Sequence, residues 1–319
     1  MKRFIFTLLF FYTIQFSIAI GPLYSLKAKG AVTSIVIENN ILYAATDAGC
    51  IDVFNWKNKK HIKSINFPMI KDFMGDEMPP KIYSIDKWPE QDRLIVVTQG
   101  SHGFRNIYLF ADGKKDKLLD ADKDKMMIKK ALFVDEGRIL MATLGNEIIL
   151  YDLNKKEFIY VKQISSSVFS DFDLNDDRTV AASTEESGII HLINIETGEI
   201  SKHLSGMNLD NIYQLVYKNQ TIIGAGQDRR ASVYSTNSSK KYYLESTFIV
   251  YCVGQSDDGT WAAFSFGEDN DIKVFNTTTK TEKAILQGQK STLTQIKFIE
   301  KNYIITAGED QDIIIWKWR

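Results

Sequence analysis

The sequence predicts an all-β protein assembled from seven similar units. Three observations support this prediction. Large apolar residues recur about every 41 residues, each within a strand-like run. Val, Ile, Thr and aromatic residues dominate these runs, and Gly, Asp and Asn separate them. Apart from the N-terminal segment, no window of comparable strength has the helical period of about 3.6 residues.

The recurring apolar residues set the register of the repeat. They are Phe54, Phe110, Tyr151, Ile193, Tyr234, Phe275 and Trp316. The first step between them is 56 residues, and the following steps are 41, 42, 41, 41 and 41 residues. Each unit contains three apolar strands, such as 212–217 and 221–226, and in all but the last unit a more polar fourth strand follows. Four strands in about 40–45 residues are typical of a propeller blade, so we expect a seven-bladed β-propeller over residues 20–319.

Two repeats in particular resemble the WD repeat. In "AGEDQDIIIW" and "GAGQDRRASVY", Asp310 and Asp228 precede the large apolar residue by six positions, as does Asp269. The chain therefore resembles WD-repeat β-propellers along essentially the whole of residues 20–319. It departs from the family pattern at the Gly-His and Trp-Asp pairs, which read Gly288-Gln289 and Trp316-Lys317 in the last repeat. These departures put the hydrogen-bonded tetrad of the family in question, but not the architecture.

The last unit lacks a fourth strand. Its three predicted strands are 293–299, 303–308 and 312–318, and the chain ends at Arg319. Near the other end, residues 20–30 contain a lone strand with Leu23, Tyr24 and Leu26. Because an open ring leaves unpaired sheet edges, we expect the N-terminal strand to pair with the C-terminal blade and close the ring.

The N-terminus has the pattern of a secretory signal peptide. Lys2 and Arg3 precede the apolar run 4–20, and Ser17 and Ala19 are the small residues of a cleavage site. We expect cleavage after Ala19, which makes residues 1–19 the signal and places the mature protein in the bacterial periplasm. The alternative is an uncleaved membrane anchor. Loss of Lys2 and Arg3 leaves 37 basic and 40 acidic residues, which gives no basic surplus for nucleic-acid binding.

The residues most often used in catalysis or metal binding are sparse. The four histidines, His61, His102, His191 and His203, stand in four separate places without metal-ligand spacing. Cys50 and Cys252 belong to the first and sixth units, which are not neighbours in a ring, so we expect two buried free thiols. Acidic pairs recur after first strands, at 135–136, 176–177 and 257–258. Their common register favours turn chemistry, with a calcium site as the alternative.

The irregular first step marks the candidate functional site. The extra residues fall in 66–81, the connection from the first unit to the second, and the turn 98–106 of the second unit is long and Gly-rich. In propellers such connections and turns share one face, so we expect both to form an exposed rim that binds partner proteins. The alternative is a loop folded over the blade edge. The candidate partner-binding residues are Phe67, Met69, Phe73, Met74, Met78, His102, Phe104, Arg105, Arg229 and Arg230.

These features indicate a non-catalytic, monomeric interaction scaffold without a cofactor of its own. An exported single WD-like propeller also resembles the accessory proteins encoded beside periplasmic nitrate reductase in some bacteria. That resemblance implies a role in maturation of, or electron delivery to, a molybdenum-containing redox enzyme. The partners would then be other periplasmic proteins, with no stable membrane insertion after signal cleavage.

The alternative function is a metal-dependent, lactonase-like hydrolase. Such propellers hold their metal in the central channel on inward-facing carboxylates, Asn and His. The candidates on predicted inner strands are Asp86, Asp171 and Asp173, and no histidine joins them.

Overall fold

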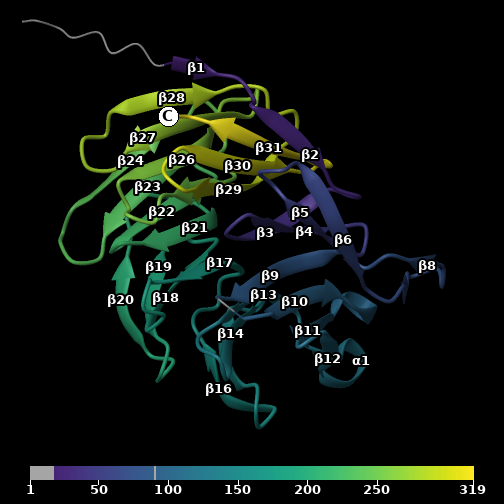
Figure 1. Cartoon of the computed structure of the whole chain (residues 1–319). Helices are drawn as coiled ribbons and strands as arrows, with labels where there is room; N and C mark the ends of the chain where they lie inside the picture. Colours follow the sequence, from purple (N-terminus) through teal and green to yellow (C-terminus); the bar gives the residue numbers. More distant parts are fainter. Residues whose placement is uncertain (1–17, 90) are drawn as a thin grey trace, which may run out of the picture.

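The computed structural model describes residues 18–89 and 91–319, so the predicted signal segment lies outside it except for Ile18 and Ala19. The described residues form seven β-sheets, each built on an antiparallel meander, that are arranged as the blades of a ring, and one small two-stranded sheet outside them (Figure 1). The predicted seven-bladed, all-β propeller is therefore confirmed.

Each blade is a meander whose first strand is the innermost. Blade 1 contains β3 (Val32–Glu38), β4 (Ile41–Thr46), β5 (Cys50–Asn55) and β6 (Lys60–Asn66). Blade 2 contains β9 (Ile82–Trp88), β10 (Arg93–Gln99), β11 (Arg105–Ala111) and β12 (Lys114–Leu119). Blade 3 contains β13 (Ile128–Phe133), β14 (Arg138–Thr143), β15 (Glu147–Asp152) and β16 (Glu157–Gln163). Blade 4 contains β17 (Phe169–Leu174), β18 (Val180–Glu185), β19 (Ile190–Asn194) and β20 (Ile200–Leu204). Blade 5 contains β21 (Ile212–Lys218), β22 (Thr221–Gly226), β23 (Arg230–Ser235) and β24 (Lys241–Glu245).

The last two blades also use N-terminal residues. Blade 6 contains β25 (Val253–Gln255), β26 (Trp261–Phe266), β27 (Asp271–Asn276) and β28 (Glu282–Leu286), with β1 (Ile18–Ile20) added at its edge. Blade 7 contains β29 (Leu293–Ile299), β30 (Tyr303–Gly308) and β31 (Asp312–Lys317), with β2 (Tyr24–Lys27) as its outer strand. Short elements outside the blades are β7 (Ile70–Lys71), β8 (Glu77–Met78), a 3₁₀ turn (Ser101–Gly103) and α1 (Ala121–Asp124).

The register confirms the repeat that the sequence predicts. Every recurring apolar residue lies opposite the second residue of the preceding strand, as Phe54 does opposite Leu42, Tyr151 opposite Ile139, and Trp316 opposite Ile304. The same position is therefore filled in all seven blades, although the side chains range from Ile to Trp.

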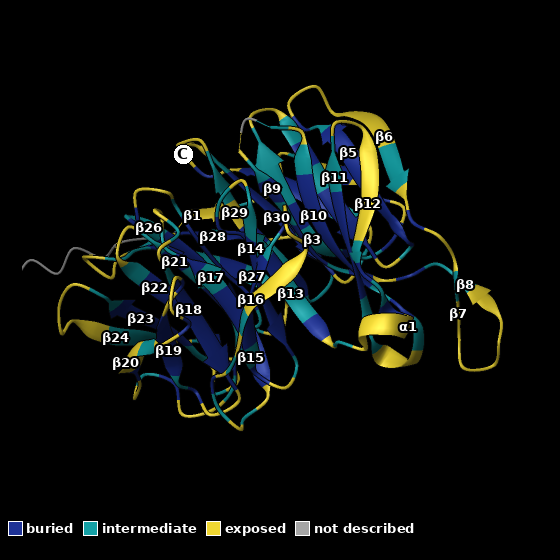
Figure 2. Cartoon of the chain, turned by 90° about the horizontal axis from the view of Figure 1, so that it is seen from below, coloured by how far each residue is buried: buried dark blue, intermediate teal, exposed yellow. Residues whose placement is uncertain are grey.

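Burial explains why the middle strands are almost continuously apolar. In β4, β5, β14 and β15 most residues are buried on both faces, because every blade packs against a neighbour on each side. The outer strands β6 and β16 are mostly exposed and carry polar and charged residues. Figure 2 shows this gradient from the buried interior to exposed outer strands such as β12 and β16.

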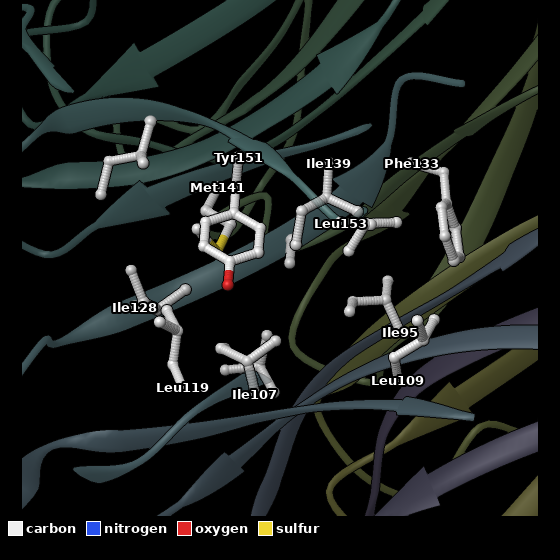
Figure 3. Close-up of a cluster of buried hydrophobic side chains, with 13 residues drawn as sticks. Ile95, Ile107, Leu109, Leu119, Ile128, Phe133, Ile139, Met141, Tyr151 and Leu153 are labelled. Carbon is white, nitrogen blue, oxygen red and sulfur yellow. The ribbon is translucent and has the colours of Figure 1, made fainter. Parts of the chain in front are cut away.

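The apolar core is divided among the blade interfaces. Seven clusters of buried side chains occur among the described residues, and each lies between two neighbouring blades. Figure 3 shows the cluster between blades 2 and 3, where Ile95 and Leu109 face Phe133, Ile139 and other residues of blade 3. A single blade therefore has no core of its own, and stacking around the ring supplies one.

The ring closes as predicted. β2 pairs antiparallel with β31, with Tyr24 opposite Ile315 and Lys27 opposite Asp312. The Lys27 ammonium lies 2.7 Å from the Asp312 carboxylate. The sequence did not predict β1, which runs parallel to β28 with Ile20 opposite Leu286. The expected cleavage position after Ala19 falls within this short strand.

Blade 7 contains a chain of side-chain hydrogen bonds at the positions that were compared with the WD repeat in the sequence. Trp316 Nε1 donates to Thr306 Oγ1 at 2.9 Å, and Thr306 Oγ1 donates to Gln289 Oε1 at 3.0 Å. Gln289 thus accepts the hydrogen bond at the position where the family has histidine. Asp310 does not join this chain of hydrogen bonds, and its carboxylate accepts from the Asp312 amide at 2.8 Å instead.

Candidate functional site

The insertion 66–81 forms a small β-hairpin between blades 1 and 2. Ile70 of β7 pairs with Met78 of β8, and Lys71 pairs with Glu77. The hairpin stands out from the body of the ring in both views (Figures 1 and 2). The sequence located the insertion but did not predict that it contains its own strands.

Hydrogen bonds fix the tip of this hairpin. The Asp72 carboxylate accepts from the amides of Met74 at 2.8 Å and Asp76 at 2.9 Å, and the Asp72 amide donates to the Asp76 carbonyl at 2.9 Å. Gly75 has a φ of 92°, a left-handed conformation that suits glycine. Short local bonds therefore order the turn even though no other segment covers it.

Two large apolar side chains are presented at the tip. Phe73 is 101% exposed and Met74 is 79% exposed, while Met69 at the base of the hairpin is 53% exposed. Met78 is half-buried. Apolar side chains this large and this exposed, next to each other on an ordered turn, are typical of a binding surface rather than of a blade surface.

Phe67 does not belong to the exposed rim. It is 6% exposed, and its ring packs against those of Tyr108 and Phe110 at centroid distances of 5.2 and 5.7 Å. The expectation that Phe67 is exposed is therefore wrong, because this residue anchors the start of the insertion in the interface between blades 1 and 2.

The turn 98–106 of blade 2 is held by Arg105. The Arg105 guanidinium lies 4.0 Å from the centre of the Tyr83 ring and donates to the carbonyls of Gly103 and Phe104. Burial lowers the pKa of Arg105. His102 is exposed with a left-handed φ of 53°, and Phe104 is half-buried. Arg105 therefore acts mainly within the turn, and His102 is its most accessible functional side chain.

A groove lies between the insertion and this turn. It has a volume of about 480 Å³ and is lined by Met69 and Ile70 of the insertion, by Gly100 and Ser101 of the turn, and by Tyr108 and other residues of blade 2 and the following segment. The predicted proximity of insertion and turn is therefore confirmed. Asp120 caps the short helix α1 beside the groove, where its carboxylate accepts from the Asp122 amide at 3.0 Å.

Arg229 and Arg230 lie far from this rim. They belong to blade 5, three blades from blade 2 around the ring, and both views separate β23 from β11 (Figures 1 and 2). The Arg230 guanidinium packs 4.2 Å from the centre of the Tyr243 ring, while Arg229 is exposed. The two arginines therefore do not extend the surface formed by the insertion.

The carboxylates considered for a hydrolase line a central cavity of about 1290 Å³ but join neighbouring blades. Asp86 accepts from the Phe133 amide at 2.8 Å, and Asp173 accepts from the Tyr217 amide at 3.0 Å. Asp171 accepts from the Leu215 amide at 3.1 Å and from Lys130 Nζ at 2.8 Å.

Each of these carboxylates thus links its own inner strand to that of the next blade. Burial raises the pKa of Asp86 against the opposing effect of Arg178. Within residues 18–89 and 91–319, no group of three or more His, Cys, Asp or Glu side chains is placed to hold a metal ion.

His61 belongs to a Ser-His-Asp group whose geometry does not suit nucleophilic catalysis. His61 Nε2 lies 3.2 Å from Asp52 Oδ1 and 3.1 Å from Ser64 Oγ, and Ser64 Oγ donates to Asp52 at 2.5 Å. In a catalytic triad, the acid and the nucleophile contact different ring nitrogens. Here the same nitrogen faces both, so the ring cannot relay a proton from serine to aspartate.

The structure brings together two histidines that the sequence analysis kept apart. His191 of β19 lies opposite His203 of β20, with their Nδ1 atoms 2.9 Å apart. The expectation of four separate histidines is therefore wrong for this pair. The turn at Thr197-Gly198 lies midway between the two residues, so hairpin pairing across that turn was the signal that could have revealed the contact.

The cysteines behave as predicted, and so do Asp135, Asp177 and Asp258 of the acidic pairs. The Asp176 carboxylate differs, because it accepts from the Asn219 amide of blade 5 at 2.9 Å. Cys50 and Cys252 are free and buried. The Asp135 carboxylate accepts from the Gly137 amide at 2.8 Å, and Asp258 accepts from the Thr260 amide at 3.0 Å. These are local turn bonds of the kind expected of Asp after a strand.

Comparison with solved structures gives a match over nearly the whole chain. The β-propeller domain of Cps50 (Swd1) from Myceliophteria thermophila superposes with a TM-score of 0.75, covering 93% of this chain and 98% of that domain. The fold is a WD-repeat-type β-propeller. The two sequences are 14% identical, so the likeness concerns the fold alone.

Sequence comparisons add no closer relationship. No family model matches the chain, and no curated protein matches it. Among the described residues, no helix has the length and apolar character that crossing a bilayer requires.

Proposed function

We propose that this propeller is a non-catalytic scaffold that binds a partner protein through the rim formed by the hairpin 66–81 and the turn 98–106. The observation that carries the proposal is the pair Phe73 and Met74, which are 101% and 79% exposed on an ordered turn. The propeller fold fits a scaffold or interaction role.

The ordered turn favours binding because it lowers the entropic cost of association. Asp72 already holds the backbone of Met74 and Asp76, so little ordering of the tip remains when a partner binds. An aromatic ring beside a flexible methionine offers a large apolar contact area that adapts to its partner. A partner that covers the tip can also fill the groove beside Met69 and Ile70.

The test compares the tip with an apolar residue at an equivalent place in another blade. Phe73→Ser together with Met74→Ser removes the anchors, whereas Leu209→Ser changes a 70% exposed side chain in the connection between blades 4 and 5. Partners captured by the wild type are quantified, and the affinity of the purified partner is then measured. We expect the double variant to weaken binding at least tenfold, which corresponds to about 1.4 kcal/mol, and Leu209→Ser to change nothing. Equal affinity of the wild type and the double variant would refute the proposal.

We further propose that the protein works as a monomer in the bacterial periplasm, where it assists a nitrate reductase. The support is the signal-like N-terminal sequence and the resemblance to nitrate reductase accessory proteins. Cell fractionation with N-terminal sequencing tests export and cleavage after Ala19, and light scattering tests the monomer. A strain that carries the Phe73→Ser/Met74→Ser protein should mature less nitrate reductase than one that carries Leu209→Ser. Equal maturation in both strains would count against this partner.

The hydrolase alternative has weaker support, because backbone amides already occupy Asp86, Asp171 and Asp173. Lactone hydrolysis in the presence of Ca²⁺ by the wild type, lost in Asp171→Asn, would restore that alternative and overturn the scaffold proposal.

A further inference from the structure

The outer half of blade 4 contains a histidine pair backed by a buried carboxylate. His191 and His203 lie opposite each other on β19 and β20, with ring centres 4.9 Å apart and an interplanar angle of 82°. His191 is 4% exposed, whereas His203 is exposed on the edge strand. Solvent therefore reaches the pair from one side only.

Glu185 holds the buried ring from behind. A Glu185 carboxylate oxygen lies 3.3 Å from His191 Nε2. The same carboxylate accepts from Asn146 Nδ2 at 2.6 Å, from Ser187 Oγ at 2.6 Å and from Ser165 Oγ. His191 Nε2 faces this carboxylate without completing a hydrogen bond, while His191 Nδ1 shares a hydrogen bond with His203 Nδ1.

We propose that His191 and His203 bind a divalent transition-metal ion of the Zn²⁺ type through their Nδ1 atoms, with Glu185 as the outer carboxylate that orients His191. Imidazole nitrogen is a favoured ligand of Zn²⁺, Cu²⁺ and Ni²⁺. Metal-ligating histidines commonly donate their second ring N–H to a carboxylate, which fixes the tautomer and raises the basicity of the ligating nitrogen.

The separation of the two nitrogens is close to what a metal needs. With Zn–N bonds of about 2.0–2.1 Å and tetrahedral angles, two ligating nitrogens are about 3.3 Å apart. The two Nδ1 atoms share a hydrogen bond at 2.9 Å, so one of them carries a proton that a bound metal ion displaces. A rotation of the exposed His203 ring supplies the difference without moving the strands, and water or a donor from a partner completes the coordination.

Two buried polar atoms beside the pair have no hydrogen-bond partner. They are His191 Nε2 and the hydroxyl of Ser183, the residue opposite His191 in β18. Buried polar groups are usually hydrogen-bonded, so these two atoms leave capacity for a ligand beside the pair.

The experiment titrates untagged, chelator-treated protein with Zn²⁺ alone in a calorimeter. We expect one saturable site per chain. Glu185→Gln should weaken binding by about 10–100-fold, the usual effect of losing an outer-shell partner, and His203→Asn should weaken it by at least about 100-fold. His61→Asn is the matched control, because His61 is also an exposed outer-strand histidine beside a carboxylate. It should leave the affinity unchanged.

A spectroscopic measurement separates the pair from other sites. In the Cu²⁺-loaded wild type, electron paramagnetic resonance should show coupling to two imidazole nitrogens, and His203→Asn should reduce this to one. Because His203 is exposed, its variant should keep the circular dichroism and melting temperature of the metal-free wild type. Absence of saturation at millimolar Zn²⁺, or equal losses in His203→Asn and His61→Asn, would overturn the proposal.

Discussion

Replacing Leu26 by Ala tests whether the N-terminal strand closes the ring. Leu26 is 5% exposed and packs between blade 7 and blade 1, in a cluster with Ile313, Ile315 and Phe54. Losing three buried carbon atoms at a Leu→Ala site costs about 2–5 kcal/mol, and we expect about 3 kcal/mol here because the rigid strands on both sides cannot collapse into the cavity. Domains are typically stable by about 5–15 kcal/mol, so this is a large fraction of the total.

Leu23→Ala provides the matched control. The Leu23 side chain is 50% exposed. Leu23 contributes to strand pairing through its backbone amide, which donates to the Ile315 carbonyl at 2.8 Å, and this hydrogen bond does not depend on the side chain that is replaced. We expect a change within about 0.5 kcal/mol.

Both variants are unfolded in urea and followed by tryptophan fluorescence, since Trp56 and Trp316 lie in the clusters on either side of blade 7. If Leu26→Ala cost less than about 1 kcal/mol, or no more than Leu23→Ala, the closure argument would be wrong.

Three further predictions concern the core and its titrating groups. Trp316→Ala should lower the free energy of unfolding by about 3–5 kcal/mol, because it empties a buried position. Trp316→Phe, which loses chiefly the hydrogen bond to Thr306, should lower it by about 1 kcal/mol. Equal losses for the two variants in urea unfolding would contradict the buried packing of Trp316. Burial raises the pKa of the Cys252 and Cys50 thiols, so neither should react with a thiol-labelling reagent at pH 8 until the protein unfolds, and rapid labelling of native protein would disprove this. Burial holds the pKa of His191 below 6.5, so the His191 ring in the unfolded chain takes up a proton at a higher pH than it does in the folded protein. The free energy of unfolding therefore has its full contribution from neutral His191 above pH 6.5 and loses it as the pH falls below that value. The urea midpoint should therefore drop between pH 7.5 and 5.5, and it should drop less in His191→Asn; equal drops in both proteins would show that another group is responsible.

The candidate site was only partly predictable from the sequence. The break in the repeat located the insertion, and the shared face of connections and turns placed it beside residues 98–106. Phe67 was misjudged because its apolar character suits either an exposed contact or a core anchor, and only the packing against Tyr108 and Phe110 decides between them. The hairpin was missed because β7 and β8 are two residues each, too short for any alternation to be read.

The sequence by itself determined the number of blades, their register and the way the ring closes. The spacing of the apolar residues along the chain determines the number of blades and their register. The unpaired edge of the last predicted strand determines the closure, because it requires a further strand, which residues 24–27 supply. Only the tertiary structure decided which side chains meet across strands and blades. It paired His191 with His203, placed Glu185 behind them and used Asp86, Asp171 and Asp173 to join neighbouring blades. These contacts depend on bulges, twist and side-chain rotamers, and none of these follows from the period of the repeat.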